Sequence, residues 1–193
     1  MKIFIINRAD RPERLAHARE ELQRNGLNAH RIEASIETHG WKGCRDSHLR
    51  ILEENNNERY FIIIEDDLQI LDGFHQTMVN AINELPADWD MLYLGANPCK
   101  EQEIYSPYLY RLNGAYCTHA IVWHPRPNGA LEYVLEHKDE ILKIDVFFSN
   151  VLMPKFNVFL TKPMIVTQKQ FQSDTCQRSD VSKIQENYNK YCK

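Results

Sequence analysis

Three consecutive carboxylates, Glu65, Asp66 and Asp67, follow the apolar run at residues 60–64. In open α/β sheets, ligands bind at the carboxyl ends of the strands. Three neighbouring negative charges repel one another unless solvent or a cation screens them, and hard divalent cations prefer oxygen ligands. Because alternate residues of an extended chain point the same way, we expect Glu65 and Asp67 to face one ion while Asp66 turns away. A solvated turn that caps the next helix is an alternative. A phosphate-accepting aspartate is another, but it would need further acids at other strand ends.

Several motifs that handle phosphates or activate a nucleophile are missing. The sequence has no G-x-G-x-x-G and no G-x-x-x-x-G-K-[ST], so Rossmann dinucleotide and P-loop sites lack support. It also has no G-x-S-x-G and no H-E-x-x-H. Ser47 and His48 are adjacent on a predicted helix, so their side chains diverge and cannot form a nucleophile–base pair. A buried structural role for His48 remains open.

The composition is that of one globular domain, which we expect to span residues 1–193 with a polar tail from about residue 175. A net charge of -4, from 23 basic and 27 acidic residues, argues against a nucleic-acid partner. No apolar run approaches the roughly 20 residues that span a bilayer. Five cysteines without a C-x-x-C pair favour reduced thiols. These features predict a cytoplasmic protein, with peripheral attachment to a membrane left open.

Apolar runs and helical periodicities alternate through the first half of the chain. Strands are expected at 2–6, 28–34, 60–64 and 90–94, and helices after Asp10, Gly43 and Asp72. This alternation predicts an α/β domain with a mostly parallel central sheet and helices on both faces. The second half adds expected strands at 109–112, 119–123, 156–160 and 164–167, which favour a mixed sheet. It also adds expected helices at 128–137 and from Asp145 to about 153, whereas 96–108 is expected to be a loop.

Six short motifs occur in a fixed order over residues 5–174. They are Ile6-Asn7 with Arg11-Pro12-Glu13-Arg14, Gly43-Cys44-Arg45-Asp46-Ser47-His48, Ile64-Glu65-Asp66-Asp67, Trp89-Asp90 through Leu94-Gly95, Ile144-Asp145, and Gln168 with Ser173-Asp174. Together they resemble the motifs of glycosyltransferase family 25, the lipopolysaccharide and procollagen sugar-transferase family. Arg8 and Ala9 depart from the family pattern, which has Leu and Asp there, and the chain is shorter than most relatives.

The resemblance implies a GT-A fold and an inverting transfer of a hexose, galactose or glucose, from a UDP-sugar to a hydroxyl. The acceptor would be a glycan, a lipid-linked glycan or a protein. It also implies a divalent cofactor, Mn²⁺ or Mg²⁺, which would neutralise charge on the leaving diphosphate. The alternative function is a catalytically inactive module of the same fold that binds a nucleotide sugar or glycan. The intact acids favour the enzyme.

The resemblance also assigns roles to individual residues. Asp67 and Glu65 would hold the metal, and Asp145 would be the general base, although a plain helix N-cap is the alternative for Asp145. The residues expected to bind the nucleotide sugar are Asn7, Arg11, Arg14, Ser47, His48, Glu65, Asp66, Gln168, Ser173 and Asp174. Tyrosines in or beside the expected loop are candidates for stacking on the acceptor sugar, namely Tyr105, Tyr108 and Tyr110.

Overall fold

A computed structural model describes residues 1–171 and 180–193. Its first half contains β1 (Lys2–Asn7), α1 (Pro12–Arg24), β2 (His30–Glu33), α2 (Gly40–Glu54), β3 (Phe61–Glu65), β4 (Leu68–Ile70), α3 (Phe74–Glu84) and β5 (Met91–Tyr93). The second half begins with β6 (Asn97–Pro98), β7 (Glu103–Ser106), β8 (Leu109–Arg111), β9 (Ala115–Tyr116), β10 (Ala120–Trp123), α4 (Ala130–Glu136) and η1 (Lys138–Glu140). It continues with α5 (Ile144–Phe147), η2 (Phe148–Leu152), α6 (Met153–Lys155), β11 (Val158–Thr161), β12 (Val166–Gln168) and α7 (Ser182–Tyr191).

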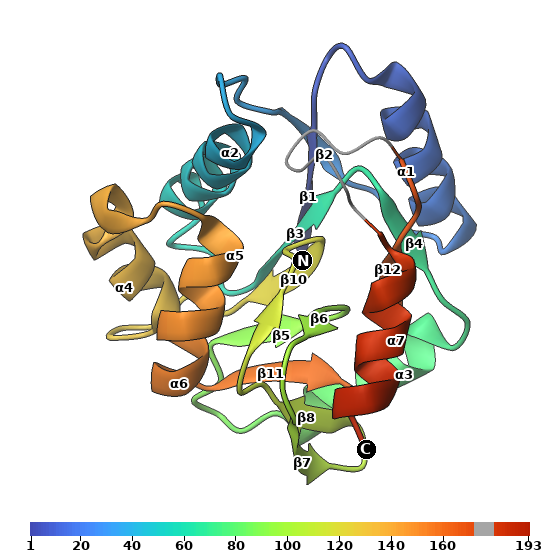
Figure 1. The fold of residues 1–193 in the computed structure, drawn as a ribbon, viewed down its shortest axis with the longest axis vertical. Coiled ribbons are helices and arrows are strands. Elements are labelled where there is room, and N and C mark those ends of the chain that lie inside the picture. Colours follow the sequence, from blue (N-terminus) through green and yellow to red (C-terminus); the bar gives the residue numbers. More distant parts are fainter. Residues whose placement is uncertain (172–179) are drawn as a thin grey trace.

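Eight strands form one central sheet in the order β2-β1-β3-β10-β5-β11-β8-β7 (Figure 1). Their pairings make β2, β1, β3, β5, β11 and β7 run in one direction, whereas β10 and β8 run in the other. The expected mostly parallel α/β sheet is therefore confirmed, and the reversed strands give it the mixed character that the second half of the sequence indicated.

The core lies on both faces of this sheet because its strands alternate their apolar side chains. Phe4 and Ile6 of β1 pack in the cluster that includes residues of α2, α4 and the α5–α6 segment. Ile3 and Ile5 pack in the opposite cluster, with residues of α1 and α3. Figure 1 shows α2, α4 and α5 grouped together and α1 and α3 standing apart from them. Helices on both faces are thus confirmed.

The residues that begin three helices differ from the expected cap residues. Asp10 does not cap α1, because Arg11 is its N-cap and the Asp10 carboxylate accepts hydrogen bonds from Arg8. The N-cap of α3 is Gly73, with a φ of 78°, rather than Asp72. Helix α2 begins at Gly40, one turn before Gly43. None of these three helices has a side-chain cap hydrogen bond, so burial of their apolar faces has to stabilise them.

Two stretches expected to lack regular structure contain elements. The predicted loop 96–108 holds β6, which pairs with β9 further along the chain, and the whole of β7, which pairs with the next strand, β8. The predicted polar tail contains α7, which buries Ile184 and is followed by the buried Cys192. Within the part of the chain that the structure describes, no helix is both long and apolar enough to cross a membrane.

Candidate functional site

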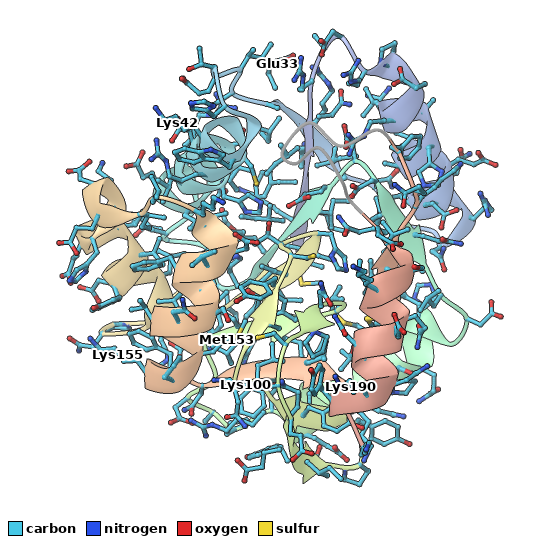
Figure 2. All side chains as sticks on the ribbon, in the orientation of Figure 1. Glu33, Lys42, Lys100, Met153, Lys155 and Lys190 are labelled. Carbon is cyan, nitrogen blue, oxygen red and sulfur yellow. The ribbon has the colours of Figure 1, made fainter. Side chains whose placement is uncertain are left out.

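A cavity of about 280 Å³ opens at the carboxyl ends of β1 and β3. Helix α2, the loops after β2 and before β10, the start of α5 and the end of β12 also line it. Glu33 and Lys42 mark this end of the molecule in Figure 2. Predicted site residues that line it are Asn7, Arg14, Ser47, His48, Glu65, Asp66, Asp67, Asp145 and Gln168. Arg11 is not among its lining residues, and Ser173 and Asp174 lie outside the described residues.

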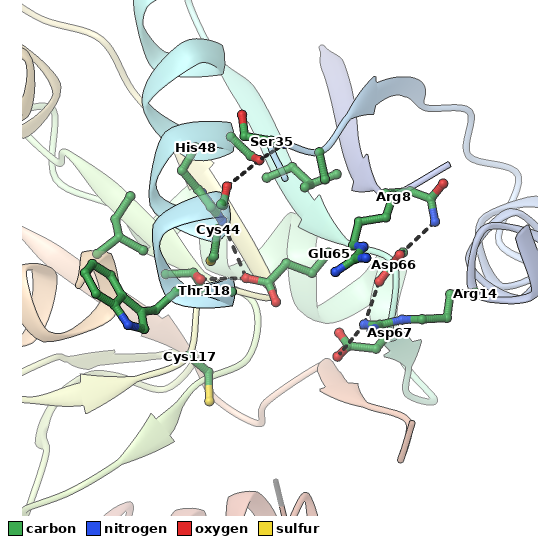
Figure 3. Close-up of a pocket in the computed structure, with 18 of the residues that line it drawn as sticks. Arg8, Arg14, Ser35, Cys44, His48, Glu65, Asp66, Asp67, Cys117 and Thr118 are labelled. Carbon is green, nitrogen blue, oxygen red and sulfur yellow. Dashed lines mark hydrogen bonds and ion pairs between the residues drawn. The ribbon is translucent and has the colours of Figure 1, made fainter. Parts of the chain in front are cut away.

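Glu65 points toward Thr118, whereas Asp66 and Asp67 both contact Arg14 (Figure 3). Strand β3 ends at Glu65 and β4 starts at Leu68, so Asp66 and Asp67 form a turn between two strands. The two-residue alternation of an extended chain therefore stops at Glu65. This turn explains why the polar partners of Glu65 and Asp67 are different residues, although both acids line the same cavity.

Glu65 faces helix α2 and the loop before β10. Thr118 Oγ1 donates a 2.6 Å hydrogen bond to Glu65 Oε1, and His48 Nε2 lies 3.4 Å from the same oxygen. Burial opposes ionisation of Glu65, but the imidazole of His48 and the hydroxyl of Thr118 outweigh it. They hold the pKa of the Glu65 carboxyl below its ordinary value. Thr118 was not predicted from the sequence, because it belongs to no motif there.

Asp66 ties the first strand and the first helix to the acidic turn. Its Oδ2 accepts a 2.8 Å hydrogen bond from Asn7 Nδ2, and its Oδ1 lies 2.6 Å from Arg14 Nη2. Asn7 also donates to the carbonyl of Arg11 at 3.1 Å and accepts from Arg31 Nε at 3.0 Å. The amide of Asn7 and the carboxylate of Asp66 thus already have several protein partners.

Asp67 lies between Arg14 and Gln168. Gln168 Nε2 is 3.2 Å from both carboxylate oxygens of Asp67, and Arg14 Nη2 is 3.2 Å from Oδ2. Antiparallel pairing of β12 with β4 places Gln168 opposite Leu68, next to the acidic turn. Burial and the negative charge of Glu65 raise the pKa of Asp67 to about 7, although Arg14 opposes this shift.

The Gly43–His48 motif combines a structural clamp with two cavity-facing groups. Ser47 Oγ donates to the carbonyl of Gly43 at 2.6 Å and accepts the backbone N–H of Ser35 at 2.8 Å. A Cβ on Gly43 would lie 2.2 Å from the Ser35 carbonyl oxygen. The glycine and the serine therefore hold the loop after β2 against α2. Cys44 and His48, one helical turn apart, lie beside Glu65.

Asp145 reaches the cavity from the start of α5. Lys143 is the N-cap of that helix, so the interpretation of Asp145 as the N-cap is wrong. The Asp145 Oδ1 accepts the backbone N–H of Val146 at 2.9 Å. Burial raises the pKa of the Asp145 carboxyl, and the charge of Glu65 acts in the same direction. The ionisation of Asp145 therefore depends on the charge of Glu65.

The Trp89–Gly95 motif supports the fold and contributes no cavity-lining residue. Asp90, 1% exposed, accepts the backbone N–H groups of Ala130 and Asn157 and pairs with Arg126 at 2.9 Å. It thereby connects β5 with α4 and β11. A Cβ on Gly95 would lie 1.8 Å from the Val166 carbonyl oxygen, so only glycine lets β12 approach this closely.

The predicted acceptor tyrosines lie elsewhere. Tyr110 is 3% exposed on β8, and Tyr105 packs its ring on Phe159 at a centroid distance of 4.9 Å. Neither they nor Tyr108 line the cavity, so their contact with an acceptor sugar stays a prediction that this site does not support. Aromatic and cationic groups to which the sequence assigned no role line it, namely Arg8, Trp41, Lys143, Lys169 and Phe171. They are scattered along the chain, and only the fold brings them together.

Two donor sets in this cavity differ in their suitability for a metal. Glu65 and Asp67 offer hard carboxylate oxygens, which suit Mn²⁺ or Mg²⁺. Among the described residues, the group of three ligand side chains found close together is Cys44, His48 and Glu65. One ligand atom from each lies within 4.8 Å of the others, and Asp67 is not part of the group.

Searches with this chain found no matching family model and no matching curated protein. Solved structures do resemble it. One is a glycosyltransferase involved in glycosylation of the major capsid of PBCV-1, at 9% identity over 98% of this chain and 100% of that one, with a TM-score of 0.52. A197 from STIV (12% identity, 92% of both chains, TM-score 0.49) is another. A third is a Drosophila β1,4-galactosyltransferase 7 mutant in complex with manganese, UDP-Gal and xylobiose (12%, 93% of this chain and 76% of that one, 0.46).

At these identities the likeness concerns the fold alone. The chain has a GT-A type of α/β fold, as the resemblance in its motifs implied. The assignment to glycosyltransferase family 25 continues to depend on the six sequence motifs.

Proposed function

We propose that the protein is a metal-dependent, inverting glycosyltransferase that moves a hexose from a UDP-sugar to an acceptor hydroxyl. One observation carries the proposal. Residues of five sequence motifs, including Asn7, His48, Asp67, Asp145 and Gln168, converge on one cavity at the carboxyl edge of a GT-A type sheet. A purely structural role would explain why these residues occur in the sequence, but it would not explain why they all line one cavity.

The donor half of the cavity is expected around the acidic turn. Transfer leaves negative charge on the UDP diphosphate, and a divalent ion bound by Asp67 and Glu65 would neutralise that charge. Arg8, Lys143 and Lys169 also line the cavity and supply positive charge near the carboxylates. Gln168, which already contacts both oxygens of Asp67, is expected to keep that carboxylate oriented.

The acceptor half is expected beside Asp145. In an inverting transfer, a base takes the proton of the acceptor hydroxyl while that oxygen attacks the anomeric carbon from the side opposite the diphosphate. The sugar–phosphate bond breaks, UDP leaves, and the proton remains on the carboxylate until solvent removes it. The upward shift in the pKa of Asp145 makes its carboxylate a stronger base than an exposed aspartate.

Release of UDP tests the proposal. The protein is incubated with a panel of UDP-sugars, led by UDP-galactose and UDP-glucose, with Mn²⁺ and with glycan, lipid-linked glycan or hydroxyl-bearing protein acceptors. We expect UDP release that stops when a chelator removes the metal. UDP-sugar binding without release for any donor or acceptor would support the inactive binding module instead.

A further inference from the structure

A second metal-binding donor set lies in the same cavity; it shares Glu65 with the predicted hard-cation site but does not include Asp67. Cys44 and His48 are separated by one turn of α2, and Glu65 ends the neighbouring strand β3. A ligand atom of each lies within 4.8 Å of the other two. We propose that Cys44, His48 and Glu65 form a binding site for a borderline divalent cation, Zn²⁺.

The chemistry of the donors selects the ion. A thiolate, an imidazole nitrogen and a carboxylate oxygen are the three ligand types that zinc binds in proteins. A thiolate is a poor partner for Mg²⁺ or Mn²⁺, which prefer oxygen donors. Binding exchanges the thiol proton of Cys44 for the metal, and the proton leaves to solvent. The proposed site therefore differs in selectivity from an oxygen site at Asp67.

The surroundings leave a fourth position open. All three side chains line the 280 Å³ cavity, which gives an ion a route from solvent and leaves room for water as the fourth ligand. The 2.6 Å hydrogen bond from Thr118 fixes one carboxylate oxygen of Glu65. Such contacts from outside the ligand set hold a ligand in its binding orientation.

The imidazole sets a limit on affinity. His48 is fully buried, and in the described residues its Nδ1 has no hydrogen-bond partner. Metal-binding histidines usually donate their second ring N–H to an acceptor, and losing such a partner costs about 10- to 100-fold in metal affinity. We therefore expect zinc binding to be correspondingly weaker than in a structural zinc site, and reversible by chelators.

Cobalt spectroscopy tests the site directly. Co²⁺ replaces Zn²⁺ in tetrahedral sites, and a thiolate ligand gives it a near-ultraviolet charge-transfer band. Titration of the metal-stripped full chain with Co²⁺ should produce this band, saturating at one equivalent. Zn²⁺ should abolish the band by displacement, and Mg²⁺ at the same concentration should not.

Matched variants locate the ligands. Cys44→Ser should remove the band and weaken zinc binding by about tenfold or more. Cys117→Ser, which alters another thiol lining the same cavity, should keep both. Asp67→Asn should also keep the cobalt band while removing a predicted ligand of the catalytic cation. Circular dichroism verifies that each variant is folded.

The measurements separate this inference from the proposed transfer reaction, because none of them requires turnover. If wild-type protein shows no thiolate–cobalt band, the cluster is only a hydrogen-bonding network around Glu65 and the proposal is overturned. A band that persists in folded Cys44→Ser protein would overturn it as well.

Discussion

Replacing Asp67 with asparagine is expected to stabilise the metal-free protein. Burial and the charge of Glu65 raise the pKa of Asp67 from its ordinary 3.8 to about 7. At about 1.4 kcal/mol for each pKa unit, ionised Asp67 costs the folded state roughly 4 kcal/mol near pH 8. Because the folded protein holds this proton more tightly than the unfolded chain, Asp67 destabilises the protein progressively as pH rises from about 4 to about 7.

Asparagine keeps the shape of the side chain but has no charge to lose. As pH rises from 5 to 8, the stability of the variant relative to wild type therefore increases by about 2–3 kcal/mol. Loss of the 3.2 Å contact with Arg14 works against this gain. Arg14 nevertheless retains its 2.6 Å contact with Asp66, so its charge is not left unpaired. We therefore expect a net stabilisation of the Asp67→Asn variant.

Urea unfolding in excess chelator at pH 5 and pH 8 measures the effect. Asp66→Asn is the matched control: it weakens hydrogen bonds to Asn7 and Arg14 at a buried site, and it should destabilise the protein by about 1–3 kcal/mol. Adding Mn²⁺ should stabilise wild type but not Asp67→Asn. If the stability of Asp67→Asn relative to wild type is the same at pH 5 and pH 8, the account of Asp67 as a carboxylate whose charge destabilises the folded protein is refuted.

Three further outcomes are expected. Asp145→Asn should lower the rate of sugar transfer by about 10²–10⁴-fold and leave UDP binding unchanged, whereas Asp139→Asn, at an exposed position, should not lower the rate. A transfer rate of Asp145→Asn within about threefold of wild type would mean that another residue is the general base. In the presence of Mn²⁺ or Mg²⁺, UDP at about 100 times its Kd should raise the free energy of unfolding by roughly 2.7 kcal/mol and Tm by about 5–10 °C. An equal rise in Tm in EDTA would exclude a metal that bridges the protein and UDP. Gly43→Ala should lower the free energy of unfolding in urea by about 1–3 kcal/mol, because its Cβ meets a backbone oxygen. The control Gly114→Ala, whose Cβ meets the flexible end of Lys100, should cost less, and equal losses of stability would contradict the clamp.

Local sequence patterns predicted the elements whose signal lies within one segment. The apolar runs of β1 and β3 and the periodicity of α1 indicated their type and extent to within a residue or two. The two-residue strands β6 and β9 exist only because they pair with each other across a distance in sequence. Helix α7 was missed because most of its residues are polar and its burial rests on few side chains.

The candidate site shows the same division between local and distant information. Motifs predicted the acids, His48 and Gln168, and these residues do line one cavity. They could not predict Thr118, whose hydrogen bond to Glu65 arises from the antiparallel pairing of β10 with β3. Sheet order and strand direction decide such neighbours, and neither is written in the local pattern of residues.

The turn after β3 gives the three consecutive acids their separate roles. Had the strand continued, Glu65 and Asp67 would share one face and compete for the same partners. Because it ends at Glu65, Asp66 becomes part of the support for β1 and α1, and Asp67 is placed against Gln168 of β12. The pKa of Asp67 is raised by burial and by the charge of Glu65, so a bound cation would relieve an unfavourable charge there. Hydrogen bonds offset the cost of burying the charge on Glu65, so that carboxylate stays ionised. It can therefore bind a cation together with Cys44 and His48 of α2.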